Sequence, residues 1–328
     1  MIKLANIESK RGEIQSGYLK VGSLADGAPI NLPFFVAQGE QDGPVLWLQG
    51  GIHGEEYGGS ASIIRCIKTL DLTKLKGTLV AFPVVNPPSY LARSRISSLD
   101  GENLNRIFPG NADGTFSHQL ANILMNEIIR NADYLLDLHS GGVFAEVPFY
   151  TIYTDVNSEA SRISKKLAKS LGPEVVWKIK DDKGLGGAIT SQVTSKGVPS
   201  VTVEVGGGTV TDIHLEQYRT AITNMMIAIG MLDGVTPKAE RYTIISDGLF
   251  IFNHHGGMFV PDCKPGDFLK KGEKIGHIVN LHGDVVEDII NEWENGYISA
   301  IRHNYSPTDV GELVAESISV ETVEDFYD

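Results

Sequence analysis

Val45-Leu46-Trp47-Leu48-Gln49 is an apolar run that ends in the glycine pair Gly50-Gly51. Such a run predicts a buried strand, and the glycines allow the chain to turn sharply directly after it. Apolar residues then recur at helical spacing between Ser60 and Leu70. A buried strand followed by a helix of this kind predicts the repeating unit of an α/β fold.

The same alternation of strands and helices continues to about residue 235. Further strands are predicted at 78–85, 134–138 and 200–205, and further helices at 117–129, 158–171 and 215–232. Ser117 is the predicted N-cap of the helix that starts there. Strands that alternate with helices predict a mixed, largely parallel sheet flanked by helices on both faces.

The composition changes after about Asp233. Gly234-Val235-Thr236-Pro237 predicts a linker, and residues 240–328 show short strand-like runs between glycine-rich turns, with no good helix. We therefore expect two domains. The first covers residues 1–235, with short strands over 1–40, and the second is a small all-β domain over 236–328. We expect the β domain to cap a pocket, to mediate homo-oligomer formation, or both.

Charge and cysteine content exclude several classes of protein. The formal net charge is −13, whereas nucleic acids and anionic membrane surfaces attract basic proteins. No run of about 18 apolar residues is present, so no membrane span is expected. Cys66 and Cys263 are far apart in sequence and predict no disulfide framework. With no apolar leader at the N-terminus, the sequence predicts a cytoplasmic protein.

Two histidines and a glutamate follow predicted strands. His53 and Glu56 are three residues apart, so a helix that begins near Glu56 directs both side chains to one point. His139 follows the strand at 134–138, and open α/β sheets place ligand sites at the carboxyl ends of strands. These side chains are ordinary zinc ligands, and three protein ligands leave a fourth position for water. The sequence therefore predicts one Zn²⁺ per chain; for His139, a hydrogen-bonded strand-end histidine is the alternative.

Glu204 is a candidate catalytic residue. It follows Val201-Thr202-Val203 and precedes Val205 and three glycines. A carboxylate at the end of such a strand is costly to bury without a partner, and a zinc-bound water would provide one. As general base and then acid, Glu204 would take a proton from that nucleophilic water and deliver it to the leaving amine. A structural glutamate in a salt bridge is the alternative.

Arginines supply candidate anion-binding groups. Asn105 and Arg106 lie in a loop bounded by glycine and proline. The guanidinium of Arg106 suits a substrate carboxylate, which it can bind bidentately. Upstream, Arg93 and Arg95 are candidates to face the oxyanion that forms when a carbonyl is attacked, and Arg95 is preferred. Solvated surface arginines are the alternative.

Together these motifs resemble those of the succinylglutamate desuccinylase/aspartoacylase family, a branch of the zinc carboxypeptidase-like hydrolases. They are His53-x-x-Glu56, Asn103-Leu104-Asn105-Arg106-x-Phe108-Pro109-Gly110, Asp137-Leu138-His139-Ser140 and Glu204-x-Gly206. The motifs span roughly residues 40–232, and the chain after residue 240 resembles the C-terminal β domain of the same family. The resemblance implies a zinc carboxypeptidase-like fold for the first domain.

The resemblance also implies a reaction, the hydrolysis of a small N-acyl amino acid to a carboxylate and a free amino acid. By this resemblance, His53, Glu56 and His139 would bind zinc, and Glu204 would transfer protons. Arg95 would polarise the scissile carbonyl, and Asn105 and Arg106 would bind the carboxylate of the amino-acid half.

The sequence departs from the family pattern in two places. Asn103 stands where relatives usually have an aspartate that orients a zinc histidine, and its side-chain oxygen can still accept that hydrogen bond. Relatives that act on acidic amino acids carry an arginine shortly before the catalytic glutamate, whereas residues 187–197 contain none. Lys196 is a poorer match for a carboxylate. We therefore expect a neutral or basic acyl amino acid, a class that includes the N-acetyl-diaminobutyrate which some family members deacetylate.

Two other functions are compatible with the same residues. A metallocarboxypeptidase acting on short peptides has a similar site but needs an open cleft for the peptide. A zinc-binding protein without turnover needs neither Glu204 nor Arg106, so the presence of both favours a hydrolase.

Overall fold

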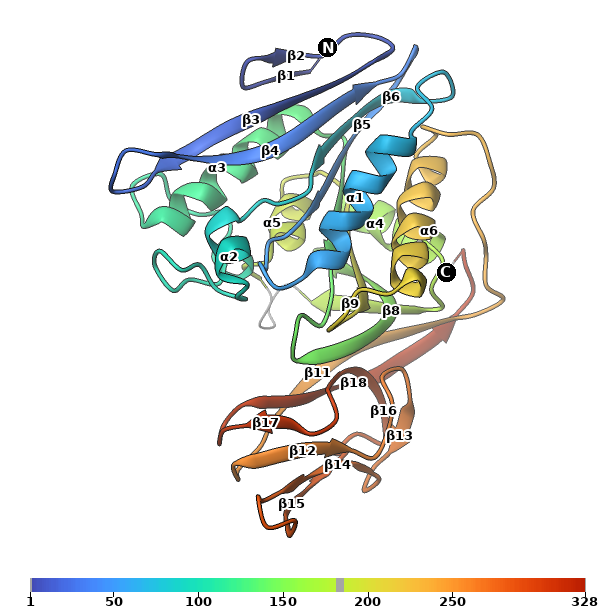
Figure 1. Cartoon of the computed structure of the whole chain (residues 1–328). Helices are drawn as coiled ribbons and strands as arrows, with labels where there is room; N and C mark the ends of the chain where they lie inside the picture. Colours follow the sequence, from blue (N-terminus) through green and yellow to red (C-terminus); the bar gives the residue numbers. More distant parts are fainter. Residues whose placement is uncertain (1, 181–185, 328) are drawn as a thin grey trace.

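The computed structural model describes residues 2–180 and 186–327. Its main feature is a twelve-stranded sheet in the order β13-β16-β18-β11-β9-β8-β10-β7-β5-β6-β4-β3 (Figure 1). The strands up to residue 206 are β1 (Lys3–Leu4), β2 (Ile7–Glu8), β3 (Glu13–Ser23), β4 (Pro29–Gln38), β5 (Gln41–Gly50), β6 (Lys76–Phe82), β7 (Tyr134–His139), β8 (Ala145–Asp155), β9 (Val175–Lys180) and β10 (Ser200–Gly206). The later strands are β11 (Tyr242–Phe252), β12 (Gly257–Pro261), β13 (Phe268–Lys270), β14 (Lys274–Val279), β15 (Val285–Ile290), β16 (Asn295–Arg302), β17 (Ser306–Thr308) and β18 (Leu313–Glu324).

The sheet is mixed, as predicted, but it is parallel only in part. β10, β7, β5 and β6 form a parallel centre, and β8, β9 and β11 are also parallel to one another. β8 runs antiparallel to β10, and both ends of the chain add antiparallel strands. The expectation of a largely parallel sheet is therefore correct for the central strands and wrong for the outer ones, most of which run antiparallel to their neighbours.

The helices are α1 (Tyr57–Thr69), α2 (Pro87–Ala92), α3 (Phe116–Asn131), α4 (Glu159–Ser170), α5 (Ile189–Ser195) and α6 (Asp212–Ala228), with the 3₁₀ turn η1 (Leu104–Arg106). Four helices, α1, α3, α4 and α6, lie close to the predicted positions, whereas α2, α5 and η1 were not predicted. Ser117 is not the N-cap of α3: Thr115 is, and the Ser117 hydroxyl donates instead to Asp100 (2.8 Å). Within residues 2–180 and 186–327, no helix combines the length and the apolar composition that crossing a bilayer requires.

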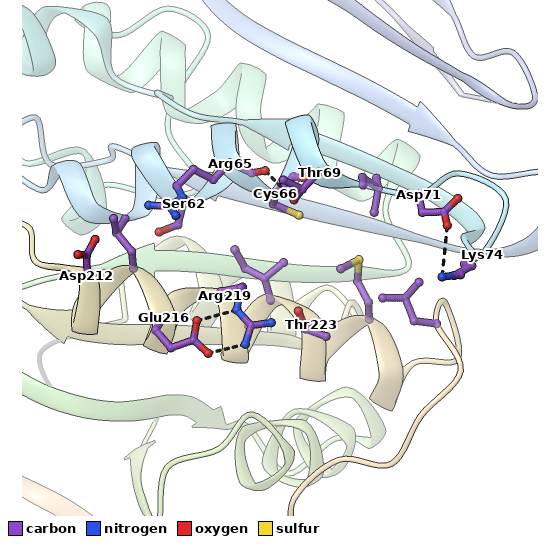
Figure 2. A pocket seen from close by; sticks show the side chains of 15 residues that line it. Ser62, Arg65, Cys66, Thr69, Asp71, Lys74, Asp212, Glu216, Arg219 and Thr223 are labelled. Atoms are coloured by element: carbon purple, nitrogen blue, oxygen red, sulfur yellow. Dashed lines mark hydrogen bonds and ion pairs between the residues drawn. The ribbon is translucent and has the colours of Figure 1, made fainter.

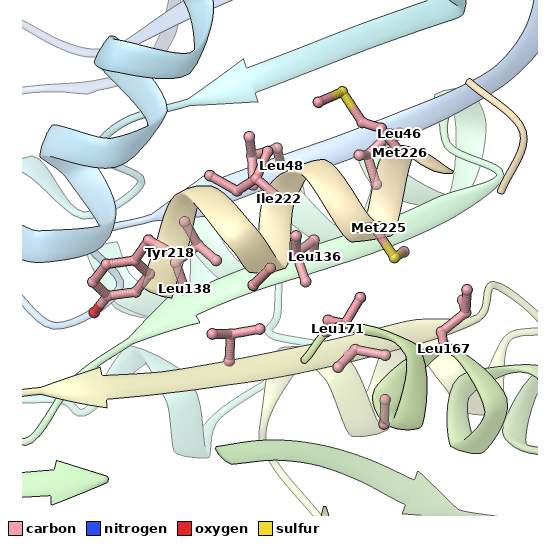
Figure 3. Close-up of a cluster of buried hydrophobic side chains, with 14 of the residues drawn as sticks. Leu46, Leu48, Leu136, Leu138, Leu167, Leu171, Tyr218, Ile222, Met225 and Met226 are labelled. Carbon is pink, nitrogen blue, oxygen red and sulfur yellow. The ribbon is translucent and has the colours of Figure 1, made fainter. Parts of the chain in front are cut away.

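Helices cover both faces of the sheet and bury two separate cores (Figure 1). α1, α4 and α6 pack on one face, where Leu136 and Leu138 of β7 meet Ile222 and Met225 of α6 (Figure 3). α3 and α5 pack on the other face, over Trp47 and its neighbours. Burial on both faces explains why the central strands have long apolar runs.

At the carboxyl ends of β7 and β10, the side chains on the two faces of the sheet differ in polarity. Leu138 and Val203 belong to the core under α1, α4 and α6. The residues that alternate with them on β7 and β10 point to the opposite face, and near the carboxyl ends of the strands these are polar: Asp137 and His139 on β7, and Thr202 and Glu204 on β10. The same strands that build the core therefore carry polar groups to one edge of the sheet.

After residue 235 the described residues form strands and no helix, as predicted. β12, β14, β15 and β17 form a separate four-stranded sheet, whereas β11, β13, β16 and β18 extend the large sheet. β16 also pairs with β8, through Ile301–Glu146 and Arg302–Ala145. This pairing closes β8, β9, β11, β18 and β16 into a ring. The boundary between residues 235 and 236 stays a prediction, and the outer ends of both predicted domains, residues 1 and 328, lie outside the described residues.

The loop after β5 is held by close backbone packing at Gly54. Its N–H donates to the Ser89 hydroxyl and to the Ser94 carbonyl oxygen, both at 2.9 Å. A Cβ at Gly54 would lie 2.0 Å from the Ser89 carbonyl group. Only glycine lets the His53 loop approach α2 this closely.

We expect Gly54→Ala to lower the free energy of unfolding by about 1–3 kcal/mol, because backbone atoms must move to admit the methyl group. Gly256→Ala is the matched control, since its Cβ would have only ordinary contacts of 3.6 Å or more, and we expect a change within about 0.5 kcal/mol. Urea titration measures both values; equal stability of the two variants would contradict the packing argument.

Candidate active site

Three buried side chains that sequence analysis selected meet at the edge of the sheet. His53 lies in the loop after β5, Glu56 is the N-cap of α1, and His139 is the last residue of β7. His53 Nδ1 lies 2.7 Å from Glu56 Oε1, and His139 Nδ1 lies 2.9 Å from Glu56 Oε2. One potential ligand atom from each residue lies within 4.8 Å of the other two, so the three can share one metal ion.

The outer nitrogen of each imidazole has its own acceptor. His53 Nε2 lies 3.1 Å from Asn103 Oδ1, and His139 Nε2 lies 2.8 Å from Asp137 Oδ2. If Nε2 donates to these oxygens, each Nδ1 presents a lone pair to an oxygen of Glu56. Two acceptors that face each other need a proton or a cation between them, and a metal ion satisfies both at once. The arrangement is the usual one for histidine ligands, whose second nitrogen is anchored by a hydrogen bond.

Buried hydrogen bonds fix both anchors. Asp137 Oδ1 accepts from Gln49 Nε2 (3.2 Å), and Gln49 Oε1 accepts from Trp47 Nε1 (2.9 Å). Asn103 Oδ1 also accepts from the backbone N–H of Asn105 (3.0 Å). The sequence analysis assigned no role to Asp137 or Gln49. In the sequence, each of the two could have been noticed as a polar residue in an otherwise apolar central strand.

Electrostatics favour an ionised Glu56. Burial alone would raise the pKa of Glu56, but the two imidazoles hold it well below its usual range. Burial lowers the pKa of His53 to about 4. Burial would also lower the pKa of His139, yet the carboxylates of Asp137 and Glu56 raise it well above its ordinary value. The cluster thus combines a charged carboxylate with two imidazoles of different basicity. A metal cation would compete with protons for the imidazole nitrogens.

A cavity of about 510 Å³ opens in front of this cluster, and Arg95, Asn105, Arg106 and Glu204 all line it. Arg95 Nη1 lies 3.2 Å from Glu56 Oε1. Arg93 is exposed, adopts a left-handed backbone conformation and does not line the cavity. Of the two upstream arginines, the structure therefore brings the preferred one to the site.

The loop with Asn105 and Arg106 presents donors to the cavity. Asn105 Oδ1 accepts from the N–H of Ile189 (2.9 Å), which leaves the amide NH₂ as the group that can contact a ligand. Arg106 Nη1 donates to the Asn105 carbonyl oxygen (2.9 Å). Burial lowers the pKa of Arg106, and the nearby Arg95 lowers it further. The two guanidinium groups repel each other, and an anion bound between them would relieve that repulsion.

Glu204 pairs in register with His139 on one side and with Tyr150 on the other. Burial raises the pKa of Glu204 to about 8. The field of His139 opposes this rise, and the Glu56 carboxylate adds to it. A carboxyl group with a pKa near neutrality can both accept and return a proton, which is what a general base and acid must do.

The opposite wall of the cavity comes from residues that the sequence analysis missed. Tyr150, Arg302, Glu312 and Glu316 line it, and Arg302 Nη1 binds Glu312 Oε2 at 2.7 Å. Three of these four belong to the C-terminal strands or the turn before β18. The structure agrees in this respect with the expectation that this region covers a pocket. Glu316 could have been suspected because it interrupts the apolar run of β18.

The stretch without an arginine, residues 187–197, reaches the cavity. Ala188 and Thr190, at the start of α5, line the cavity. Lys196 is exposed at the far end of α5 and is not among the lining residues, so it does not replace the missing arginine.

A second cavity, of about 530 Å³, lies between α1 and α6 (Figure 2). Arg65, Asp71, Lys74, Glu216 and Arg219 give it charges of both signs. Its lining contains no histidine, and the described residues contain no metal cluster besides His53, Glu56 and His139. The chemistry suggested by the sequence is therefore confined to the first cavity.

Comparisons with known proteins identify relatives of this chain. The model of the succinylglutamate desuccinylase/aspartoacylase catalytic domain matches residues 42–229. N-alpha-acetyl-L-2,4-diaminobutyric acid deacetylase from Halomonas elongata is 27% identical over 322 residues, covering 95% of this chain and 93% of that protein.

Solved structures share the fold over the whole chain. The product-bound ectoine utilization protein EutE (DoeB) from Ruegeria pomeroyi superposes with a TM-score of 0.85 at 24% identity, covering 96% of this chain and 98% of that one. A succinylglutamate desuccinylase/aspartoacylase from Rhodobacter sphaeroides gives 0.84 at 24% identity, with coverages of 97% and 98%. The chain belongs to the succinylglutamate desuccinylase/aspartoacylase family of enzymes that hydrolyse the amide bonds of N-acyl amino acids.

Proposed function

We propose that this protein is a zinc-dependent deacylase that hydrolyses the amide bond of a small N-acyl amino acid. The observation that carries the proposal is the meeting of His53, Glu56 and His139 at one point, beside a cavity lined by Glu204. The similarity to a diaminobutyric acid deacetylase supports an acetyl or another small acyl group.

The donor set fits zinc. Two imidazole nitrogens and one carboxylate are the protein ligands of many catalytic zinc sites, which keep a further position open. The facing lone pairs of the two Nδ1 atoms and Glu56 are relieved by one dication. A zinc ion held by His53, Glu56 and His139 would polarise the amide carbonyl and would lower the pKa of a bound water from 15.7 towards about 7. One ion per chain is proposed.

Glu204 moves the protons in this mechanism. It accepts a proton from the attacking water and then delivers one to the nitrogen of the leaving amine. The raised pKa suits the second step, because the protonated form of Glu204 is accessible near neutral pH. Protonation of the nitrogen lets it leave as a neutral amine and not as an amide anion, so the C–N bond can break.

The arginines hold the substrate and stabilise developing charge. We propose that Arg106 and the amide NH₂ of Asn105 bind the carboxylate of the amino-acid half. Arg95 faces the scissile carbonyl and stabilises the oxyanion as it forms. Its ion pair with Glu56 holds the guanidinium beside the residues that would bind zinc.

The shape of the cavity favours a small substrate over a peptide. Residues from β16 and β18 contribute to the lining of a cavity of about 510 Å³, whereas a carboxypeptidase needs an open path for the rest of the chain. The presence of Glu204 beside the cluster favours turnover over metal storage. The cytoplasmic location and the homo-oligomer remain proposals; the free thiols of Cys66 and Cys263 are compatible with a reducing compartment.

We expect Glu204→Gln to keep its zinc and its fold but to lower kcat on N-acetyl amino acids by about 10²–10⁴-fold, because the proton acceptor is gone. Zinc content by elemental analysis and amine release measure the two effects. The exposed Glu216→Gln on α6 is the control and should match the native rate. A native enzyme that turns over equally well after complete chelation of metal would refute the mechanism.

We expect Asp137→Asn to weaken zinc binding by about 10–100-fold, because a neutral amide orients His139 less well and leaves it less basic. Competition with a chromophoric chelator gives the affinity. Asp113→Asn, in an exposed turn away from the cluster, should bind zinc like the native protein. Unchanged affinity in Asp137→Asn would show that this hydrogen bond does not support the metal.

A further inference from the structure

The cavity extends from the metal cluster into the closed ring of strands. All five strands of the ring, β8, β9, β11, β18 and β16, contribute to its lining; one residue from each is Tyr150, Trp177, Phe250, Glu316 and Ala300, respectively. A cluster of buried apolar side chains is again drawn from all five strands, and several of its members also line the cavity. A substrate whose amide lies at the metal therefore has an apolar, aromatic-lined recess into which its side chain can point.

Glu316 is the charged group of this recess. It pairs in register with Phe250 on β11 and with Ala300 on β16, so the three side chains lie next to one another on one face of the sheet. The small Ala300 side chain leaves space beside the carboxylate. The Ser299 hydroxyl donates to Glu316 Oε2 at 3.3 Å.

Glu316 has no ion-pair partner within 4.0 Å among the described residues. Other carboxylates on or next to the same strand do have partners: Glu312 pairs with Arg302, and Glu321 with Lys178. Arg95 and Arg106 act on Glu316 only through space. Burial raises the pKa of Glu316, as expected for a carboxylate that has lost water without gaining a cation.

We propose that Glu316 binds the side-chain ammonium group of the substrate, and hence that the substrates are N-acyl amino acids with a short, amine-bearing side chain. This inference rests on the proposed function. The ligand then spans the cavity: its carboxylate lies at Arg106, its amide at the metal and Glu204, and its ammonium at Glu316. Apolar walls favour such a pair, because an ion pair is stronger where water is excluded.

The residues around α5 are consistent with this assignment. An acidic side chain would need an unpaired cation in the recess: Ala188 and Thr190 supply none, and Arg302, which also lines the cavity, is paired with Glu312. An acidic side chain would also be repelled by Glu316. A positioning role is the competing explanation, in which the negative field of Glu316 holds Arg95 and Arg106 in place. That role would affect every substrate in the same way, whereas recognition of an ammonium group would not.

A pair of substrates of equal shape separates the two explanations. In α-N-acetyl-2,4-diaminobutyrate the side chain ends in an ammonium group, and in α-N-acetylnorvaline a methyl group takes its place. We expect the zinc-loaded native enzyme to prefer the first by kcat/KM. Glu316→Gln, which keeps the size of the side chain, should lose at least about 30-fold on the first, the range for removing one partner of a buried charge pair. It should change less than about threefold on norvaline.

Controls make each outcome decisive. Glu321→Gln removes a carboxylate from the same strand outside the cavity and should keep the native preference. Thermal melting and zinc content confirm that Glu316→Gln is folded and contains zinc.

Equal losses on both substrates, or no loss on either, would overturn the recognition of ammonium by Glu316. A native enzyme that cleaves acetylnorvaline but not the basic substrate would also overturn it while leaving the deacylase function intact. Failure of the native enzyme on every acyl amino acid would instead reject the deacylase function.

Discussion

The carboxylate of Glu56 is buried between two imidazoles, and its charge determines what the surrounding residues must do. A buried carboxylate costs several kcal/mol unless it is paired, and here both neighbours present lone pairs when their outer nitrogens donate. Asn103 and Asp137 accept those outer hydrogen bonds, and Gln49 and Trp47 hold Asp137 in turn. The hydrogen-bonded layer behind the cluster therefore keeps the ligands pointed at one position, which a dication is well suited to fill.

The cavity separates charges of opposite sign. Arg95 and Arg106 lie near the metal cluster, whereas Glu316 lies in the recess of the strand ring. Opposite charges at fixed positions orient a polar ligand and penalise the reversed arrangement. The field of the site, more than its volume, thus distinguishes between ligands of similar size.

Sequence analysis recovered the parts of the site that are encoded locally. His53 and Glu56 are three residues apart, and His139 ends an unmistakable apolar strand, so spacing alone placed them. α2 was missed because Pro87-Pro88 indicated only the end of a strand, and α5 because it has only two turns. Closure of the ring joins residues 145–146 to 301–302. No local pattern encodes a pairing over that separation, so Glu316 could not be placed at the site from sequence.

The ring also has a consequence for how the bound substrate can change. Glu204 and the residues proposed to bind zinc all precede residue 205, whereas Phe250, Ala300 and Glu316 belong to strands encoded later in the chain. Substitutions in the later strands can alter the recess while the residues proposed for hydrolysis stay unchanged. A change in the acyl amino acid that is bound therefore requires no change in the residues proposed to cleave it.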